Sequence, residues 1–408
     1  VPIFNRAHYG RLRSVLNAIK KHPQLELQTM VAIPAVYNSL WSAIKHGRPN
    51  SWDVALPWYL KARLISFFGL ESKIVTNDFL INHLTDDGFK VNSLVPMFLD
   101  GGVSETMVKS VGLGIISLAD ELKRLNPDIV FVNADRFEMM ALAITASYLN
   151  IPIVHNEAGD VSGTIDESIR HAITKLAHIH FTSTETSRRR VIQMGENSKF
   201  VFNVGAPAID SVKSLDLGKS LGWESKLGGR FILVLLHPVA TMSQADNISM
   251  VEKLMETLNR VNINTIWIGS NVDAGSGVIS KTMKEWRQRG IFPKNVVFEK
   301  NLNPDDFYHV LAKSVCAVGN SSSFIREAAY FGVPVVLVGS RQLGRERAGN
   351  TLEVPAETEA LVRAVNMQLQ VGRYPRSYLF GEGNTGDKIA AILAEVKPVI
   401  QKNFVDLL

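Results

Sequence analysis

The chain has 408 residues, of which 46% are hydrophobic and 20% charged, so a mainly disordered protein is excluded and about two to three globular domains are expected. Its net charge of +5 comes from scattered basic residues, which argues against a nucleic-acid-binding surface and suits an anionic small substrate. The lone Cys316 excludes an intramolecular disulfide, and its apolar neighbours predict a buried, unreactive thiol.

The start of the chain shows no signal peptide, and the most apolar stretch, residues 55–70, is interrupted by Lys61 and Arg63. That stretch is too short and too charged to cross a bilayer. We therefore expect a cytoplasmic protein that does not associate with a membrane.

Apolar runs alternate with amphipathic runs through the first half of the chain. Helical spacing is found at residues 9–20, 108–125 and 138–149. Strands are expected at residues 1–4, 25–32, 128–133, 151–155, 179–183 and 200–204. Strands that are apolar along their whole length are typical of a parallel sheet with helices on both faces.

Residues 33–70 do not fit this alternation. They carry Trp41, Trp52 and Trp58 and a dense apolar face, which indicates a helical insertion. Such a face forms either a local core or an oligomer contact, and we favour partial use as an interface.

The pattern restarts after a break near Gly205-Ala206-Pro207. Strands are expected at residues 231–236, 265–269, 296–299, 315–318 and 333–338, and helices at 249–261 and 385–396. The sequence thus predicts an α/β protein with two consecutive doubly wound, Rossmann-like domains. The Gly-rich dinucleotide fingerprint and the Walker A loop are both missing, which argues against NAD-dependent and P-loop chemistry.

Polar residues follow five of the predicted strands, where open α/β sheets bind their ligands. They include Asp135, Glu157, His237, Asn271 and the pair Ser322 and Ser323. Each has an ordinary alternative, because Asp135 or a serine could cap a helix, Glu157 could be a loop acid and His237 a near-core histidine. Together they favour a cleft between the two domains.

Further candidates flank these strand ends. Asp166 and Arg170 are four residues apart on one helix face, either as a surface ion pair or as a carboxylate held by a guanidinium. The turn 319–323 could bind a diphosphate through backbone N–H groups, and Glu327 could accept hydrogen bonds from a ribose unless it only favours the helix dipole. Arg341 and Arg345 could clamp phosphate.

At this point the sequence resembles the hydrolysing UDP-N-acetylglucosamine 2-epimerases of the sialic and nonulosonic acid pathways. The matching blocks, in family order, are Asn5-Arg6-Ala7-His8-Tyr9, Asp135-Arg136-Phe137, His155-Asn156-Glu157-Ala158-Gly159, VSGTIDESIRH at 161–171, His237-Pro238-Val239, Asn271-Val272-Asp273-Ala274-Gly275, GNSSSFIRE at 319–327 and RQLGRE at 341–346. The long VSGTIDESIRH block is the most specific of these.

The resemblance implies a glycosyltransferase-B-like fold with domains 1–206 and 207–380, the ligand between them, and residues 381–408 packing back on the first domain. UDP would lie mainly on the second domain. The implied binding residues are Arg6, Arg11, Arg136, Arg170, Asn271, Ser322, Ser323, Glu327, Arg341 and Arg345. The implied catalytic residues are Asp135, Glu157, Asp166 and His237.

The resemblance also implies the chemistry. Anti elimination of the C2 proton and UDP would leave 2-acetamidoglucal, and water would then add on the other face to release N-acetylmannosamine. Asp135, Glu157 and Asp166 are the candidate acids and bases, and the sequence does not decide which one takes the proton. No cofactor or metal is expected, and a homodimer or homotetramer is implied.

Three departures from the family pattern bear on the sugar. Asn133-Ala134 stands where many relatives have His-Gly, Arg11 stands where lysine is common, and the Trp-rich insertion is unusual. A UDP-2,4-diacetamido-2,4,6-trideoxyhexose is therefore a second candidate substrate. A glycosyltransferase of the same fold and a non-catalytic UDP-sugar sensor compete with the epimerase reading, although three acids near a dianionic ligand argue against a sensor.

Overall fold

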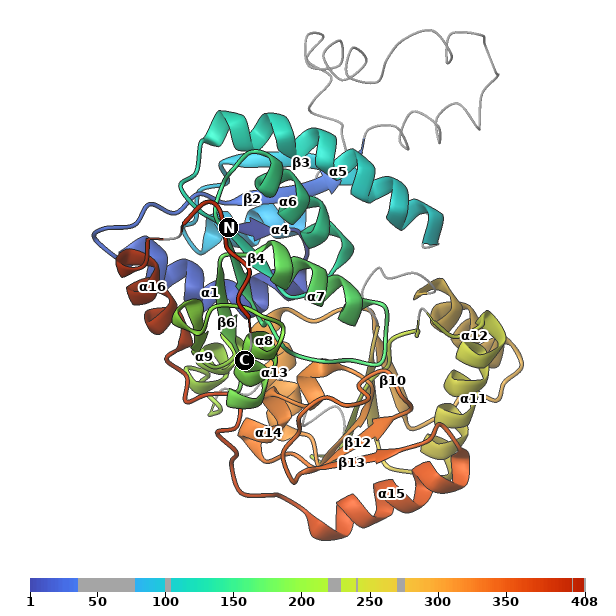
Figure 1. The fold of residues 1–408 in the computed structure, drawn as a ribbon. Coiled ribbons are helices and arrows are strands. Elements are labelled where there is room, and N and C mark those ends of the chain that lie inside the picture. The colour runs from blue at the N-terminus through green and yellow to red at the C-terminus, as the bar shows by residue number, and fades with distance from the viewer. Residues whose placement is uncertain are drawn as a thin grey trace, which may run out of the picture.

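The computed structural model describes residues 1–35, 78–99, 104–218, 229–239, 241–269, 276–397 and 399–406. It contains two units built from parallel strands and helices, the first in blue to green and the second in yellow to orange (Figure 1). The predicted α/β class with parallel sheets is therefore confirmed.

Among the described residues the first unit holds seven strands. They form one sheet in the order β1 (Pro2–Ile3), β2 (Met30–Pro34), β3 (Ser93–Phe98), and a second in the order β4 (Val130–Asn133), β5 (Ile153–Asn156), β6 (Ile179–Thr182), β7 (Val201–Asn203). Strand β1 contacts β4, so the two sheets adjoin. All pairings are parallel.

Helices cover both faces of this unit. They are α1 (Arg6–Lys21), α4 (Asp78–Asp86), α5 (Ser104–Leu125), α6 (Phe137–Tyr148), α7 (Asp166–Leu176) and α8 (Glu185–Gln193), and the short helix η2 (Ser198–Phe200) precedes β7. One core lies under α1 and α4 and includes Leu12 and Leu80. The other lies under α5 and α6 and includes Leu118 and Leu142.

The second unit has one six-stranded sheet. Its order is β10 (Val296–Glu299), β9 (Thr265–Ile268), β8 (Ile232–Leu235), β11 (Cys316–Gly319), β12 (Val335–Val338), β13 (Thr351–Val354). Its helices are α9 (Ala208–Lys213), α11 (Gln244–Val261), α12 (Ser276–Gln288), α13 (Pro304–Lys313), η3 (Ser322–Phe324), α14 (Glu327–Phe331) and α15 (Thr358–Val371). Apolar side chains from both faces of the sheet form two separate cores.

The last helix, α16 (Thr385–Glu395), lies against α1 of the first unit (Figure 1). Asp210 accepts hydrogen bonds from the backbone N–H groups of Thr385 (2.9 Å) and Gly386 (2.7 Å), which satisfies two free donors at the start of α16. A Cβ atom at Gly386 would lie 2.7 Å from the carbonyl oxygen of Ser14, so the close approach requires glycine. We keep 1–206, 207–380 and 381–408 as the proposed domain limits.

Most predicted elements occur within a few residues of their expected limits, with informative exceptions. Strand β2 begins at Met30 rather than at residue 25, and its pairing with both neighbours starts there, at Pro2 of β1 and Ser93 of β3. Strands β3 and β13 were not predicted, and both are sheet edges. Pro96 within β3 is tolerated at such an edge, where one side of the strand needs no ladder hydrogen bonds.

Cys316 is buried on β11, as predicted, and burial raises the pKa of its thiol to about 12. Most of the Trp-rich segment lies outside the described residues. No described helix is both long and apolar enough to span a membrane.

Candidate active site

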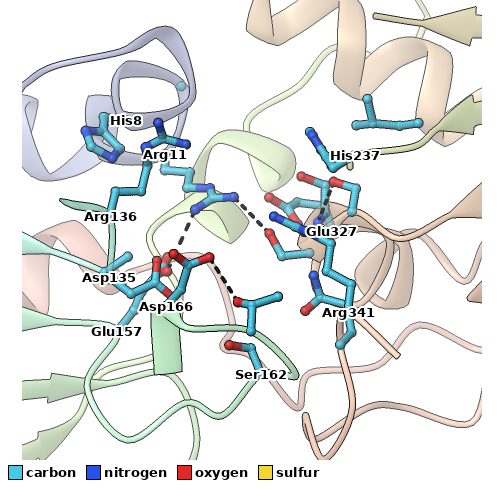
Figure 2. Close-up of a pocket in the computed structure, with 18 of the residues that line it drawn as sticks. His8, Arg11, Asp135, Arg136, Glu157, Ser162, Asp166, His237, Glu327 and Arg341 are labelled. Atoms are coloured by element: carbon cyan, nitrogen blue, oxygen red, sulfur yellow. Dashed lines mark hydrogen bonds and ion pairs between the residues drawn. The ribbon is translucent and has the colours of Figure 1, made fainter. Parts of the chain in front are cut away.

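A cavity of about 260 Å³ lies where the strand ends of the two units face each other (Figure 2). Twelve of the fourteen predicted site residues line it: Arg11, Asp135, Arg136, Glu157, Asp166, Arg170, His237, Ser322, Ser323, Glu327, Arg341 and Arg345. Asn271 lies outside the described residues, and the side chain of Arg6 is not described. The two halves of the chain thus contribute to one hollow.

Glu157 follows β5 in a left-handed backbone conformation, with φ at 61°. Its buried carboxylate lies 2.6 Å from the Arg326 guanidinium of the second unit and 3.9 Å from that of Arg11. Burial acts to raise the pKa of Glu157, but the charges of Arg326 and Arg11 outweigh it and hold the pKa at about 2. Glu157 is therefore ionised at neutral pH and joins the two units.

Asp135 follows β4, and its neighbour Ala134 has φ at 62°, so the chain turns sharply at this strand end as well. Asp135 is paired with Arg170, which is buried on α7. Arg170 also donates to the carbonyl oxygen of Asp160 at 2.8 Å. The guanidinium thus holds Asp135.

The expected partnership of Asp166 with Arg170 is wrong. The carboxylate of Asp166 instead accepts a hydrogen bond from the Thr164 hydroxyl at 3.0 Å, at the start of α7 (Figure 2). Arg170, one turn later, pairs with the Asp135 carboxylate beyond the end of β4. Asp166 has no ion-pair partner within the described part of the chain.

The second unit supplies a turn with small residues between β11 and α14. Ser321 caps the short helix η3 by accepting from the backbone N–H of Ser323 at 3.3 Å. The Ser322 hydroxyl accepts from Arg11 at 2.9 Å, a contact between the two units. Serine hydroxyls and backbone N–H groups beside an arginine suit an anionic ligand.

Glu327 is fully buried and lines the cavity. Neither of its carboxylate oxygens has a hydrogen-bond partner among the described residues. Because a buried polar atom without a partner is costly, this carboxylate is suited to accept hydrogen bonds from a ligand.

His237 follows β8 and is held through its backbone. Its N–H donates to the Asn320 side chain at 2.7 Å, and the Asn320 amide donates back to the His237 carbonyl at 2.8 Å. These paired bonds tie the ends of β8 and β11 together and hold the backbone of His237 at the cavity wall.

The two later arginines are engaged with protein groups. Arg341 donates to the carbonyl oxygen of Asn320 at 3.0 Å. Arg345 contacts the Asp160 carboxylate at 2.5 Å and the Gln342 side chain at 3.0 Å. Asp160 belongs to the first unit, so Arg345 also bridges the two halves.

Sequence reasoning missed His8, which lines the cavity. It also missed Arg326 and Asp160, which hold the lining residues Glu157 and Arg345. Arg326 precedes Glu327 in the GNSSSFIRE block, but its partner Glu157 is far away in sequence. His8 stands in the first matching block, buried at the cavity wall. Membership of those blocks was the signal that could have found these two residues.

Comparisons with known proteins agree with this architecture. The family model described as UDP-N-acetylglucosamine 2-epimerase matches residues 75–394. The UDP-N,N'-diacetylbacillosamine 2-epimerase (hydrolyzing) of Legionella pneumophila is 33% identical over 78% of this chain and 84% of its own length. The UDP-N-acetylglucosamine 2-epimerase of Neisseria meningitidis is 26% identical over 98% of this chain and 97% of its own.

Solved structures of the same fold cover nearly the whole chain. The UDP-GlcNAc 2-epimerase of Methanocaldococcus jannaschii, solved with UDP-GlcNAc and UDP, has a TM-score of 0.72 at 18% identity, covering 96% of this chain and 98% of its own. The Neisseria meningitidis enzyme bound to UDP-GlcNAc has a TM-score of 0.71 at 17% identity, covering 97% and 99%. The glycosyltransferase-B-like fold is thereby confirmed, and the chain belongs to the UDP-N-acetylglucosamine 2-epimerase family.

Proposed function

We propose that this chain is a hydrolysing 2-epimerase that converts UDP-N-acetylglucosamine to N-acetylmannosamine and UDP. The observation that carries the proposal is the single cavity in which Asp135, Glu157 and Asp166 of the first unit face His237 and Glu327 of the second. It combines acids for proton transfer with a second wall suited to a nucleoside diphosphate.

The second unit is the proposed UDP site. The Glu327 carboxylate, which has no hydrogen-bond partner among the described residues, would accept hydrogen bonds from the two ribose hydroxyls. Ser322 and Ser323 would hold the pyrophosphate at the η3 turn, with Arg11 and Arg341 beside it. Positive groups at this place stabilise the charge that develops on UDP as it leaves.

The proposed first step is an anti elimination. A carboxylate takes the C2 proton, the C1–O bond to UDP breaks, and its electron pair leaves with the pyrophosphate as a C1–C2 double bond forms. In the second step water supplies a hydroxyl to C1 and a proton reaches C2 from the opposite face. The product is the free 2-epimerised sugar, and no redox change is involved.

Asp166 is our candidate for the carboxylate that takes the C2 proton. Glu157 is held between Arg326 and Arg11 with a pKa of about 2, which makes it a weak base. Asp135 is committed to Arg170. Among the described residues, Asp166 accepts only a neutral hydroxyl from Thr164, so its carboxylate is the most available of the three.

A second candidate substrate is a UDP-linked 2,4-diacetamido-2,4,6-trideoxyhexose. The Legionella pneumophila relative named for UDP-N,N'-diacetylbacillosamine is 33% identical over 78% of this chain, and the Campylobacter jejuni relative named for GDP/UDP-N,N'-diacetylbacillosamine is 32% identical over 65%. The Neisseria enzyme named for UDP-N-acetylglucosamine is 26% identical over 98%. The same acids and the same elimination would serve both sugars, because the reacting C1 and C2 atoms are alike.

Proton NMR of the reaction in deuterated water tests both candidates. UDP and a free 2-epimerised sugar should appear together, with deuterium at C2, and the preferred UDP-sugar should give the higher kcat/KM. An epimer still linked to UDP would indicate a non-hydrolysing epimerase. A glycoside formed on an added acceptor would indicate a transferase, and binding without turnover would indicate a sensor.

A further inference from the structure

One buried imidazole in the cavity wall has no part in the reaction as proposed above. His8 lies in the first turn of α1, is 1% exposed and lines the cavity (Figure 2). Its Nδ1 atom has no hydrogen-bond partner among the described residues. Because a buried polar atom without a partner is costly, such an atom on a side chain that lines a cavity indicates a place for a ligand atom.

The tautomer of His8 follows from its neighbour Asn5. The Asn5 side-chain oxygen accepts from the backbone N–H of His8 at 2.9 Å, and its amide nitrogen donates to the Glu138 carboxylate at 3.1 Å. These two contacts fix the orientation of the Asn5 amide. Its nitrogen therefore also donates to Nε2 of His8, 3.3 Å away, and the imidazole proton lies on Nδ1.

The ring is uncharged at neutral pH. Burial, followed by the charges of Arg136 and Arg11, lowers the pKa of His8 to about 3. The negative charge of Glu157 acts in the opposite direction and does not outweigh them. The Glu138 carboxylate accepts from the Arg136 side chain at 2.8 Å and from Asn5 at 3.1 Å. His8 thus presents a neutral N–H donor.

We propose that His8 donates a hydrogen bond from Nδ1 to an acceptor oxygen on the sugar half of the substrate, and that Asn5 positions it by fixing the tautomer. The proposal rests on the proposed function, because it needs a sugar in this part of the cavity. His8 belongs to the first-unit wall with Asp135 and Glu157, opposite the serine turn and Glu327. A neutral N–H donor suits an uncharged acceptor such as a hydroxyl or acetamido oxygen.

Two replacements of His8 distinguish donation from the Nδ1 position from donation from the Nε2 position. In His8→Asn the side-chain amide can donate from near the position of Nδ1, whereas in His8→Gln it reaches toward Nε2. We expect His8→Gln to lower kcat/KM for the UDP-sugar by about tenfold to a hundredfold and His8→Asn to recover most of that loss. The affinity for UDP alone should change less than about threefold in both. Equal losses in the two variants, or a matching loss of UDP affinity, would overturn the proposal.

Nitrogen-15 NMR of the imidazole supplies a readout independent of turnover. The wild-type protein should show the Nδ1–H tautomer, and its Nδ1–H signal should shift on saturation with UDP-N-acetylglucosamine but not with UDP. Asn5→Ser keeps a helix cap but removes the amide donor, so a mixture of tautomers is expected. An Nε2–H tautomer in the wild type, or a signal that ignores the sugar, would refute the role of His8. If the sugar shifts the signal but no UDP is released, the proposed function fails while the His8 contact stands.

Discussion

Replacing Glu157 by Gln should change the pH dependence of stability in a way that the geometry fixes in sign and size. Glu157 is buried, lies 2.6 Å from Arg326 and has a pKa of about 2, against an ordinary value of 4.5. At about 1.4 kcal/mol per pKa unit, this difference stabilises the folded protein by about 3 kcal/mol once the carboxylate is ionised.

The sign follows from the lowered pKa. The contribution is complete above pH 4.5, where the unfolded carboxylate is also ionised, and it is lost as the pH falls toward about 2. Glu157→Gln removes this contribution and leaves the buried Arg326 cation without its partner, so the variant should be less stable at neutral pH by about 3–5 kcal/mol. From pH 6 to pH 3 the difference in unfolding free energy between the wild type and the variant should narrow by about 2 kcal/mol.

Urea unfolding of both proteins at a series of pH values measures this difference in unfolding free energy. Groups that titrate equally in the wild type and the variant do not contribute to it. Glu196→Gln is the matched control. Burial acts to raise the pKa of Glu196, but hydrogen bonds from His180, Lys175 and Lys402 hold it at about 2, and Glu196 does not line the cavity. The control should alter acid stability and leave turnover intact. A difference in unfolding free energy for Glu157→Gln that stays constant with pH would refute the assigned ion pair.

Three further changes test the proposed site. Asp166→Asn should lower kcat by at least about a hundredfold, with UDP affinity nearly unchanged, and should abolish deuterium incorporation at C2 in NMR assays; retention of exchange would move the base elsewhere. Glu327→Gln should weaken UDP binding by about tenfold in calorimetry, because a carboxylate that accepts two ribose hydroxyls becomes a poorer acceptor; unchanged affinity would remove Glu327 from the UDP site. Gly163→Ala would drive a Cβ atom into the Ser340 carbonyl oxygen, so it should lower the unfolding midpoint in urea and reduce kcat. An unfolding midpoint equal to that of the wild type would show that the loops carrying Gly163 and Ser340 can move apart at no cost.

The sheets and the strand-end residues were predictable because local patterns determine them. The runs that form β8 and β11 are apolar throughout, whereas β4 and β5 begin apolar and end in polar residues. Parallel topology brings the carboxyl ends of paired strands together. Strand β3 was not predicted because Pro96 interrupts its apolar pattern and because it pairs with a neighbouring strand along one edge only. Local periodicity is weakest where a strand has only one neighbour.

The partners of the charged groups were not predictable, because these ion pairs join residues far apart in sequence, both within the first unit and between the two units. The four-residue spacing predicted an ion pair between Arg170 and Asp166 on the same helix. In the folded protein Arg170 instead pairs with Asp135, which follows β4. Spacing likewise gave no reason to join Arg326 to Glu157. Which charged groups pair in a cleft depends on the tertiary structure. The spacing of residues along one helix does not predict it.

Asp160 and Arg345 give the sharpest test of whether these contacts between the units matter for turnover. The Asp160 carboxylate accepts from Arg345 at 2.5 Å and from the Ser187 hydroxyl at 2.9 Å, while its carbonyl accepts from Arg170. If Arg345 acts by holding Asp160, then Arg345→Gln and Asp160→Asn should each lower kcat, and the double variant should be little worse than either one, because both remove the same contact. If Arg345 instead binds UDP directly, Arg345→Gln alone should weaken UDP binding, and the two effects should add. Steady-state kinetics and UDP calorimetry on the three variants distinguish these outcomes, and additive effects would refute the view that the pair works as one unit.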